Sequence, residues 1–258
     1  MLVLKFSESG ERLRSLLNKR IVFLDGGMGT LIQRCGLTEA DYHKGSPELE
    51  TSKVELIGNN DLLNLSRPDV IEKIHLDYYM AGSDIVTTNS FALTDIAQAD
   101  YGISNELIDT LNKRAVAIAK TAASKASKAL GKDVNELFVA GSIGPMNKSA
   151  SIACDVEDAS VRAVTFDELT SAYSKQMQSM YEAGVDLFLL ETSIDTLNVK
   201  AAIYAYLNLI EKWGVRVPIS ISMTVSDASG RILSGQTIEA FYASIRHAQP
   251  LFVGLNCS

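Results

Sequence analysis

The stretch LFLLETSIDTLN (residues 187–198) contains a complete passage from a strand to a helix. Its first four residues are all apolar, which is typical of a strand buried on both faces in a parallel sheet. Glu191 follows where the apolar run ends, and Asp195 precedes an amphipathic segment, residues 196–213, that Gly214 closes. Asp195 and Thr196 are interpreted as the cap of that helix. The order of apolar strand, polar end and capped helix predicts one βα unit.

The same pattern recurs along the whole chain. Six apolar runs are predicted to be strands, residues 21–27, 84–91, 138–145, 187–192, 218–225 and 252–257. Amphipathic segments between them are predicted to be helices, residues 68–81, 106–130, 166–183, 196–213 and 237–248. Repeated βα units leave two main architectures, a doubly wound open sheet and a closed (β/α)₈ barrel.

The strand ends favour the barrel. Each run finishes on a polar or turn-forming residue, in chain order Asp25, Asn89, Gly144-Pro145, Glu191-Thr192, Thr224 and Asn256-Cys257. A barrel gathers its active groups at the carboxyl ends of successive strands, whereas an open sheet gathers them at one switch point. The sequence therefore predicts one α/β domain, residues 1–258, with the (β/α)₈ TIM barrel fold. Because only about six of the eight βα units are visible, we expect the barrel to be incomplete at its C-terminus.

Composition and charge exclude several classes of protein. The net charge of −7 argues against a nucleic acid or an anionic membrane as partner. No apolar run reaches the roughly 18 residues of a transmembrane helix, and the N-terminus lacks the pattern of a signal peptide. Cys35, Cys154 and Cys257 are widely spaced and odd in number, which does not suggest a disulfide framework. We therefore expect a cytoplasmic protein.

Glu191 is a candidate binding residue. An unpaired carboxylate at the end of an apolar strand would cost several kcal/mol of desolvation, so this side chain needs a partner. A ligand ammonium would serve, and so would a buried lysine or arginine.

The turn DGGMGT (residues 25–30) is a second candidate. Its glycines let the backbone approach a ligand, and free N–H groups at a helix start favour an anion. The turn matches neither nucleotide-binding glycine motif, so a small carboxylate or phosphate is the expected ligand. A plain tight βα turn explains the same residues.

Two polar loops follow strands of the predicted sheet. In residues 141–161, Asn147 and Ser149 are candidates for substrate contact, although a purely structural loop is an equal alternative. In residues 225–237, Asp227 and Arg231 are interpreted as a local ion pair. The alternative for this second loop is a small hairpin over the barrel mouth.

Cys257 is the cysteine best placed for chemistry. A free thiol at the end of a barrel strand can bind a soft metal or act as a nucleophile, but buried unreactive cysteines are common. Cys154 is interpreted as a bystander in its loop, and Cys35 as a packing residue.

Long segments of the chain resemble the homocysteine S-methyltransferase family, and within it the homocysteine-binding module of cobalamin-dependent methionine synthases. The likeness runs from about Arg20 to the end of the chain. It is carried by VFLDGGMGTLIQ, GNNDLLNLSRPDVIEKIHLDYYMAGSDIVTTNSF, GSIGPMNKSASIACDVEDASVRAVTFDEL, DLFLLETSIDTLNVKAAI, SDASGRILSGQTIEAFYASIRHA and FVGLNC. The stretches VEDASVRAVTFDEL and DASGRILSGQT are more similar to the cobalamin-dependent enzymes than to relatives that use betaine or methylmethionine.

This resemblance implies a (β/α)₈ barrel that transfers a methyl group to homocysteine to form methionine. It implies a zinc ion on three cysteine thiolates, which binds the homocysteine sulfur and keeps it as a nucleophilic thiolate. The methyl group would come from methylcobalamin on another module, remethylated by methyltetrahydrofolate. The first zinc cysteine of the family falls on Cys257, and Asn256 would line the site beside the metal.

The resemblance also implies how the amino acid is held. The substrate ammonium would lie against Glu191 and Asp25, which gives the strand-end carboxylate its missing partner. The substrate carboxylate would bind backbone groups of the turn, here Gly26, Gly27 and Met28.

The sequence departs from the family in three places. It has GPMN where GPTN is usual, and SIACDV where SISPDV is usual. The other two zinc ligands, an adjacent Cys-Cys pair after strand seven, are absent from the 258 residues. One thiolate does not make a zinc site. The leading hypothesis is therefore the N-terminal part of such a barrel. The alternatives are a catalytically silent fragment that binds homocysteine weakly or needs a complementing chain, and a barrel that binds phosphate without zinc.

Overall fold

The sheet of the computed structural model, which describes residues 4–226 and 228–257, has five parallel strands. The strands are β1 (Ile85–Thr87), β2 (Phe138–Ile143), β3 (Leu187–Ser193), β4 (Ile219–Met223) and β5 (Val253–Leu255). Their order across the sheet is their order in the chain. A doubly wound sheet reverses its order at a switch point, so this arrangement is instead the wall of a barrel. The α/β class is confirmed, and the curled half-barrel is consistent with part of the predicted fold.

The first predicted strand, residues 21–27, forms only a single parallel bridge, between Leu24 and Ile85. Its backbone is nevertheless fixed to β1, because Asp25 N donates to Ile85 O at 3.0 Å and Asp84 N donates to Phe23 O at 2.8 Å. The prediction that this run is buried on both faces is wrong, since Ile21 is 76% and Phe23 is 60% exposed. Among the described residues the run is paired on one side only.

The same correction applies to the last predicted strand. In β5, Val253 is 39% and Leu255 is 53% exposed. β5 pairs with β4 alone in the part of the chain that the structure describes, so its outer edge lies open. Full burial was expected from an apolar sequence, but burial also requires a neighbour.

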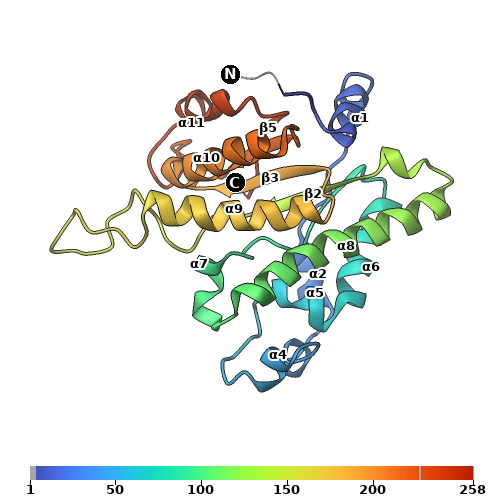
Figure 1. The fold of residues 1–258 in the computed structure, drawn as a ribbon, viewed down its shortest axis with the longest axis horizontal. Helices are drawn as coiled ribbons and strands as arrows, with labels where there is room; N and C mark the ends of the chain where they lie inside the picture. The colour runs from blue at the N-terminus through green and yellow to red at the C-terminus, as the bar shows by residue number, and fades with distance from the viewer. Residues whose placement is uncertain (1–3, 227, 258) are drawn as a thin grey trace.

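The helices form a layer outside the sheet. The long ones are α6 (Pro68–Met80), α8 (Asn105–Leu130), α9 (Phe166–Glu182), α10 (Thr196–Trp213) and α11 (Ile238–Ile245), and each predicted helix is confirmed within a few residues. Successive helices pack side by side, α6 on α8, α8 on α9 and α9 on α10, in the order of the strands that they follow (Figure 1). The main apolar core lies between these helices and the strands.

Shorter elements connect the units. They are α1 (Glu8–Leu17), α2 (Met28–Arg34), α3 (Glu39–Tyr42), α4 (Pro47–Thr51), η1 (Asn60–Leu62), α5 (Leu63–Ser66), α7 (Asp95–Gln98), η2 (Ala99–Tyr101), η3 (Val134–Glu136) and η4 (Arg246–Ala248). The five predicted helices begin within one residue of their expected starts. Asp195 accepts hydrogen bonds from Leu197 N and Asn198 N at the start of α10, which confirms its role as the cap.

The two polar loops differ in their structure. Residues 144–163 have little regular structure, and the loop projects beyond the end of α9 (Figure 1). The loop after β4 closes on itself through an antiparallel bridge between Arg231 and Thr237, which is the hairpin alternative. Asp227, the expected ion-pair partner of Arg231, lies outside the described residues. No helix in the described part of the chain is long and apolar enough to cross a membrane.

Candidate active site

The carboxyl ends of the strands surround a cavity of about 600 Å³. The residues that the resemblance assigned to binding or catalysis all line this cavity, namely Asp25, Gly26, Gly27, Met28, Glu191, Asn256 and Cys257. They come from three separate places, the turn into α2, the end of β3 and the end of β5. The parallel sheet therefore brings together side chains that are more than 200 residues apart in the sequence.

Asp25 is held at one side of the cavity by β1. Thr87 N donates to Asp25 Oδ2 at 2.8 Å, and the Thr87 hydroxyl lies 3.1 Å from both carboxylate oxygens. Burial raises the pKa of Asp25 to about 7, although the Thr87 hydrogen bonds oppose the rise and the charge of Glu191 adds to it. This carboxyl group is thus poised to become fully charged when a cation reaches it.

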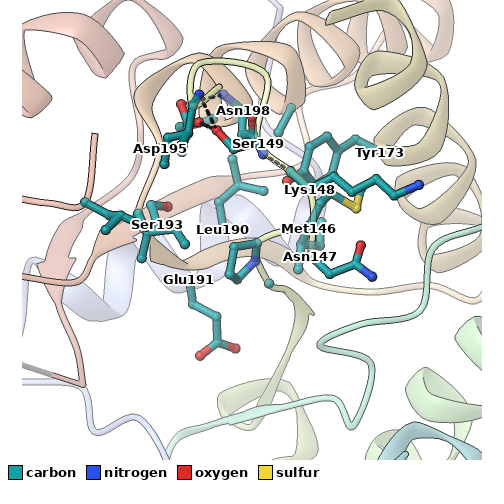
Figure 2. A pocket seen from close by; sticks show the side chains of 18 residues that line it. Met146, Asn147, Lys148, Ser149, Tyr173, Leu190, Glu191, Ser193, Asp195 and Asn198 are labelled. Carbon is teal, nitrogen blue, oxygen red and sulfur yellow. Dashed lines mark hydrogen bonds between the residues drawn. The ribbon is translucent and has the colours of Figure 1, made fainter. Parts of the chain in front are cut away.

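Glu191 lies on the same cavity at the end of β3. Its Oε1 accepts a hydrogen bond of 2.5 Å from the Ser142 hydroxyl, and burial raises its pKa. The carboxylate is directed away from the loop side chains around Ser149 and Asp195 (Figure 2). Among the described residues that line the cavity there is no lysine, arginine or histidine. The carboxylate therefore has a hydrogen-bond donor but no cationic partner, and the alternative of a buried lysine or arginine is wrong for the described residues.

A third carboxyl group, Asp61 in η1, also lines the cavity. It is buried and accepts a hydrogen bond of 2.9 Å from Ala92 N, and burial raises its pKa to about 6. The sequence analysis missed this residue. Its signal was an acidic residue beside an apolar stretch, DLLNL (residues 61–65), although here the carboxyl group precedes the apolar residues, whereas Glu191 follows them.

The turn into α2 is fixed by Tyr78. The Tyr78 hydroxyl donates to Gly27 O at 3.2 Å, and a Cβ atom placed on Gly26 would lie 3.0 Å from the same hydroxyl. A side chain at residue 26 would therefore crowd the Tyr78 hydroxyl, so glycine suits this position. Gly26, Gly27 and Met28 border the cavity on the other side.

Cys257 is exposed and has a left-handed backbone conformation, with φ of 53°. Asn256 Nδ2 donates to its Sγ atom at 3.2 Å. No group of three or more histidine, cysteine, aspartate or glutamate side chains in the described residues is arranged to hold a metal ion. Since a zinc site needs at least three protein ligands, the described residues on their own do not fit zinc.

Asn147 and Ser149 do not line this cavity. They border a neighbouring pocket of about 160 Å³ between the loop after β2 and the start of α10 (Figure 2). Asn147 Nδ2 donates to Asp100 Oδ2 at 3.0 Å, and the Ser149 hydroxyl donates to Asp195. Both side chains hold the loop in place, which favours the structural alternative. Cys35 is exposed, so its interpretation as a packing residue is wrong, because α2 turns Ile32 instead toward the core.

The chain is similar to a known protein family and to solved structures. The family model of homocysteine S-methyltransferases matches residues 22–258. The structure is similar to that of the homocysteine methyltransferase MmuM from Escherichia coli. The metallated form has a TM-score of 0.73 and 23% identity over 95% of this chain and 78% of that chain. The oxidized form has a TM-score of 0.74 and 23% identity over 95% of this chain and 77% of that chain. The apo form has a TM-score of 0.65 and 22% identity over 95% of this chain and 76% of that chain. At these identities the structural likeness supports the fold, and the sequence match assigns the family. The chain belongs to the homocysteine S-methyltransferase family.

Proposed function

We propose that the cavity at the strand ends binds homocysteine and presents its sulfur for methyl transfer, with methionine as the product. The observation that carries this proposal is the pairing of two carboxyl groups, Asp25 and Glu191, in a cavity that Cys257 also lines. Two acidic groups of raised pKa with no basic neighbour favour a ligand that brings its own positive charge. The ammonium group of an amino acid supplies that charge.

In this proposal the chain's own groups orient the substrate. The ammonium lies between Asp25 and Glu191 and shifts both toward the ionised form. The substrate carboxylate binds backbone N–H groups of the turn at Gly26, Gly27 and Met28, which Tyr78 holds in place. With both ends of the amino acid fixed, the sulfur points toward the end of β5. The turn alone would also accept a phosphate, but the three carboxyl groups of the cavity oppose a dianion, so the phosphate-binding alternative is disfavoured.

We propose further that Cys257 is one ligand of a zinc ion. When bound, zinc would keep the homocysteine sulfur as a thiolate. Because the described residues supply a single thiolate at this position, the resemblance to the family implies that the other two ligands are a Cys-Cys pair outside the 258 residues. Methylcobalamin on another module is the proposed methyl donor, with methyltetrahydrofolate as the ultimate source. The same single thiolate favours the alternative that this chain alone binds homocysteine weakly without turning it over.

The test is calorimetric titration of the chain with L-homocysteine and with 4-mercaptobutyrate, which lacks the ammonium group. Homocysteine should bind more tightly than 4-mercaptobutyrate. Glu191→Gln should weaken the binding of homocysteine about tenfold or more, because it removes a charge-assisted contact. Glu157→Gln, which changes an exposed carboxylate in the loop after β2, is the matched control and should leave binding unchanged. Equal affinity for the two ligands, or equal effects of the two variants, would overturn the proposal.

Zinc is tested on a chain extended through a Cys-Cys pair. It should bind about one zinc ion, and Cys257→Ala should abolish that binding because a catalytic site needs three protein ligands. On the complete enzyme, Glu191→Ala should raise the KM for homocysteine far more than it changes the use of methyltetrahydrofolate. An extended chain that binds no zinc would contradict the metal assignment.

A further inference from the structure

The side chain of Asn256 is fully occupied by protein partners. Its Oδ1 atom accepts from Thr192 N at 3.0 Å and from the Ser222 hydroxyl at 2.6 Å. Its Nδ2 atom donates to Thr192 Oγ1 at 2.8 Å and to Cys257 Sγ at 3.2 Å. A primary amide has two donor hydrogens and one oxygen with two lone pairs, so these contacts use its whole capacity. Asn256 lines the cavity but has no hydrogen bond left to offer a ligand.

Thr192, the main partner of that amide, has an unusual backbone conformation. Its φ of 57° lies in the left-handed region, which a β-branched residue rarely enters. It stands where the register between β3 and β4 shifts, between Leu190 and Ser193. Strain of this kind persists only where surrounding contacts impose it, and it concentrates at functional sites. The two hydrogen bonds to Asn256 are among the contacts that surround Thr192.

These contacts connect the two halves of the site. Thr192 directly follows Glu191 on β3, and Asn256 directly precedes Cys257 after β5. Ser222, on β4 between them, anchors the same amide oxygen. The backbone of Asn256 is fixed as well, because its N donates to Met223 O at 3.0 Å and its O accepts from the Thr224 hydroxyl at 3.0 Å. One amide therefore joins the ends of three strands.

We propose that Thr192 and Asn256 are positioning residues that form a strand-end clamp, which fixes Glu191 relative to Cys257. Asn256 then acts on homocysteine through Glu191 and Cys257 and not by contact, in place of the direct role that the resemblance assigned to it. This inference rests on the proposed function for its effect on binding, whereas the clamp itself can be measured without homocysteine.

A double-mutant cycle in homocysteine affinity separates positioning from contact. Asn256→Ala should weaken binding about tenfold, as expected for the loss of hydrogen bonds worth about 1.4 kcal/mol. In a Glu191→Gln background the same change should weaken binding only about twofold, because residues that act through one another are not additive. Additive effects of the two changes would overturn the proposal.

Thr192 variants supply the conservative control. Thr192→Ser keeps the hydroxyl that accepts from Asn256, so its affinity for homocysteine should lie within about twofold of that of the wild type. The nearly isosteric Thr192→Val loses this hydroxyl, and its affinity for homocysteine should fall about fivefold. Thr121→Val removes a hydroxyl from an exposed helical position on α8 and should have no effect. If the serine and valine variants bind equally well, the hydroxyl contact does not position Glu191 and the proposal is wrong.

The second readout needs no substrate. Cys35, Cys154 and Cys257 are all exposed, so iodoacetamide labelling followed by mass spectrometry gives three rates in one sample. Iodoacetamide alkylates the thiolate, and an N–H that donates to sulfur favours that form, so Asn256→Ala should lower the rate at Cys257 about threefold or more. Cys35 and Cys154 are the internal controls and should keep their rates. An unchanged or higher rate at Cys257 would contradict the clamp. If the wild-type chain fails to bind homocysteine, the proposed function fails, and this readout still decides the clamp.

Discussion

Asp25 is the residue at which the fold most clearly opposes a charge. Burial raises its pKa from 3.8 to about 7, so the folded protein keeps this proton over a range in which the unfolded chain has lost it. Between about pH 4 and pH 7 the folded state therefore binds more protons, and the free energy of unfolding contributed by Asp25 falls as the pH rises. Glu191 and Asp61, whose pKa values are also raised, act in the same direction.

We therefore predict that Asp25→Asn stabilises the protein at pH 8 more than at pH 5. The amide is neutral at both values, and its oxygen can still accept from Thr87 N. Urea denaturation of the wild type and the variant at both pH values measures the difference. The prediction is contradicted if Asn changes the free energy of unfolding equally at pH 5 and pH 8.

Single residues were predictable where the sequence pattern marked them as anomalous. Glu191 was identified from the cost of a carboxylate at the end of an apolar strand, and Cys257 from its place at a strand end. Asp61 was missed because the segment around it was not assigned to any element. Thr192 was missed because nothing in the letters ETS reports a left-handed φ or a contact with a residue 64 positions away.

At the scale of elements, a buried ion pair helps to anchor the segment that carries Asp25. Arg20 Nη1 and Nη2 donate to the two carboxylate oxygens of Asp84 at 2.7 and 2.8 Å, and the Asp84 side chain is 2% exposed. Burial raises the pKa of Asp84, but the hydrogen bonds from Arg20 and Phe23 N outweigh it and the pKa is lowered. The same carboxylate accepts from Phe23 N at 3.0 Å, so the ion pair adds to the backbone hydrogen bonds that tie residues 23–25 to Asp84 and Ile85.

Arg20→Met should therefore destabilise the protein by about 3 kcal/mol, because it leaves a buried carboxylate without its partner. Lys73→Met is the matched control, since it breaks an exposed pair with Asp77 and should cost less than about 0.5 kcal/mol. Chemical denaturation at pH 7 measures both. Similar losses in the two variants would show that the Arg20 pair does not hold this segment.

A second prediction at this scale concerns the packing of strand β2. A Cβ atom on Gly141 would lie 2.7 Å from Met180 Sδ and 3.2 Å from Val185 Cγ2, so α9 and the turn after it pack directly on this glycine. Gly141→Ala should cost about 1–3 kcal/mol through overpacking. The strand glycine Gly254, whose added Cβ would meet nothing closer than 3.8 Å, is the control and should tolerate alanine. Equal free energies of unfolding for the two variants would contradict the close packing.

The elements were predicted better than their pairing. Helices such as α10 were predicted to the residue, because capping residues and terminal glycines act locally. Strands were predicted in place, and all except β3 were predicted too long; β1, for example, covers 85–87 of the expected 84–91. Strand length and burial depend on the neighbouring strands, which an apolar run cannot report. Residues 21–27 have the composition of a core strand and yet form one bridge, because only β1 pairs with them in the described structure.

At the scale of the whole molecule, barrel architecture explains why the site could be predicted at all. Parallel strands in sequential order place every strand end on one face, so the polar residues that end four of the six apolar runs, at Asp25, Asn89, Glu191-Thr192 and Asn256-Cys257, line the cavity. The rule predicts which residues meet and not how they are bonded. The positions of Asp25 and Cys257 followed from the rule, whereas the saturation of the Asn256 amide required the structure.

The two edges of the half-barrel lead to the last prediction. Ile21 and Phe23 on one edge and Val253 and Leu255 on the other are exposed, and in the described residues neither edge has an outer neighbour. Open apolar edges with free backbone groups pair with other chains. We therefore predict that this chain self-associates with rising concentration, and that Ile21→Lys combined with Leu255→Lys reduces the association by placing charge on both edges. Val156→Lys, which changes an exposed apolar residue in the loop after β2, should not. Light scattering over a concentration series measures the mass. A monomeric wild type, or a reduction with Val156→Lys equal to that of the edge variant, would show that association does not run through these edges.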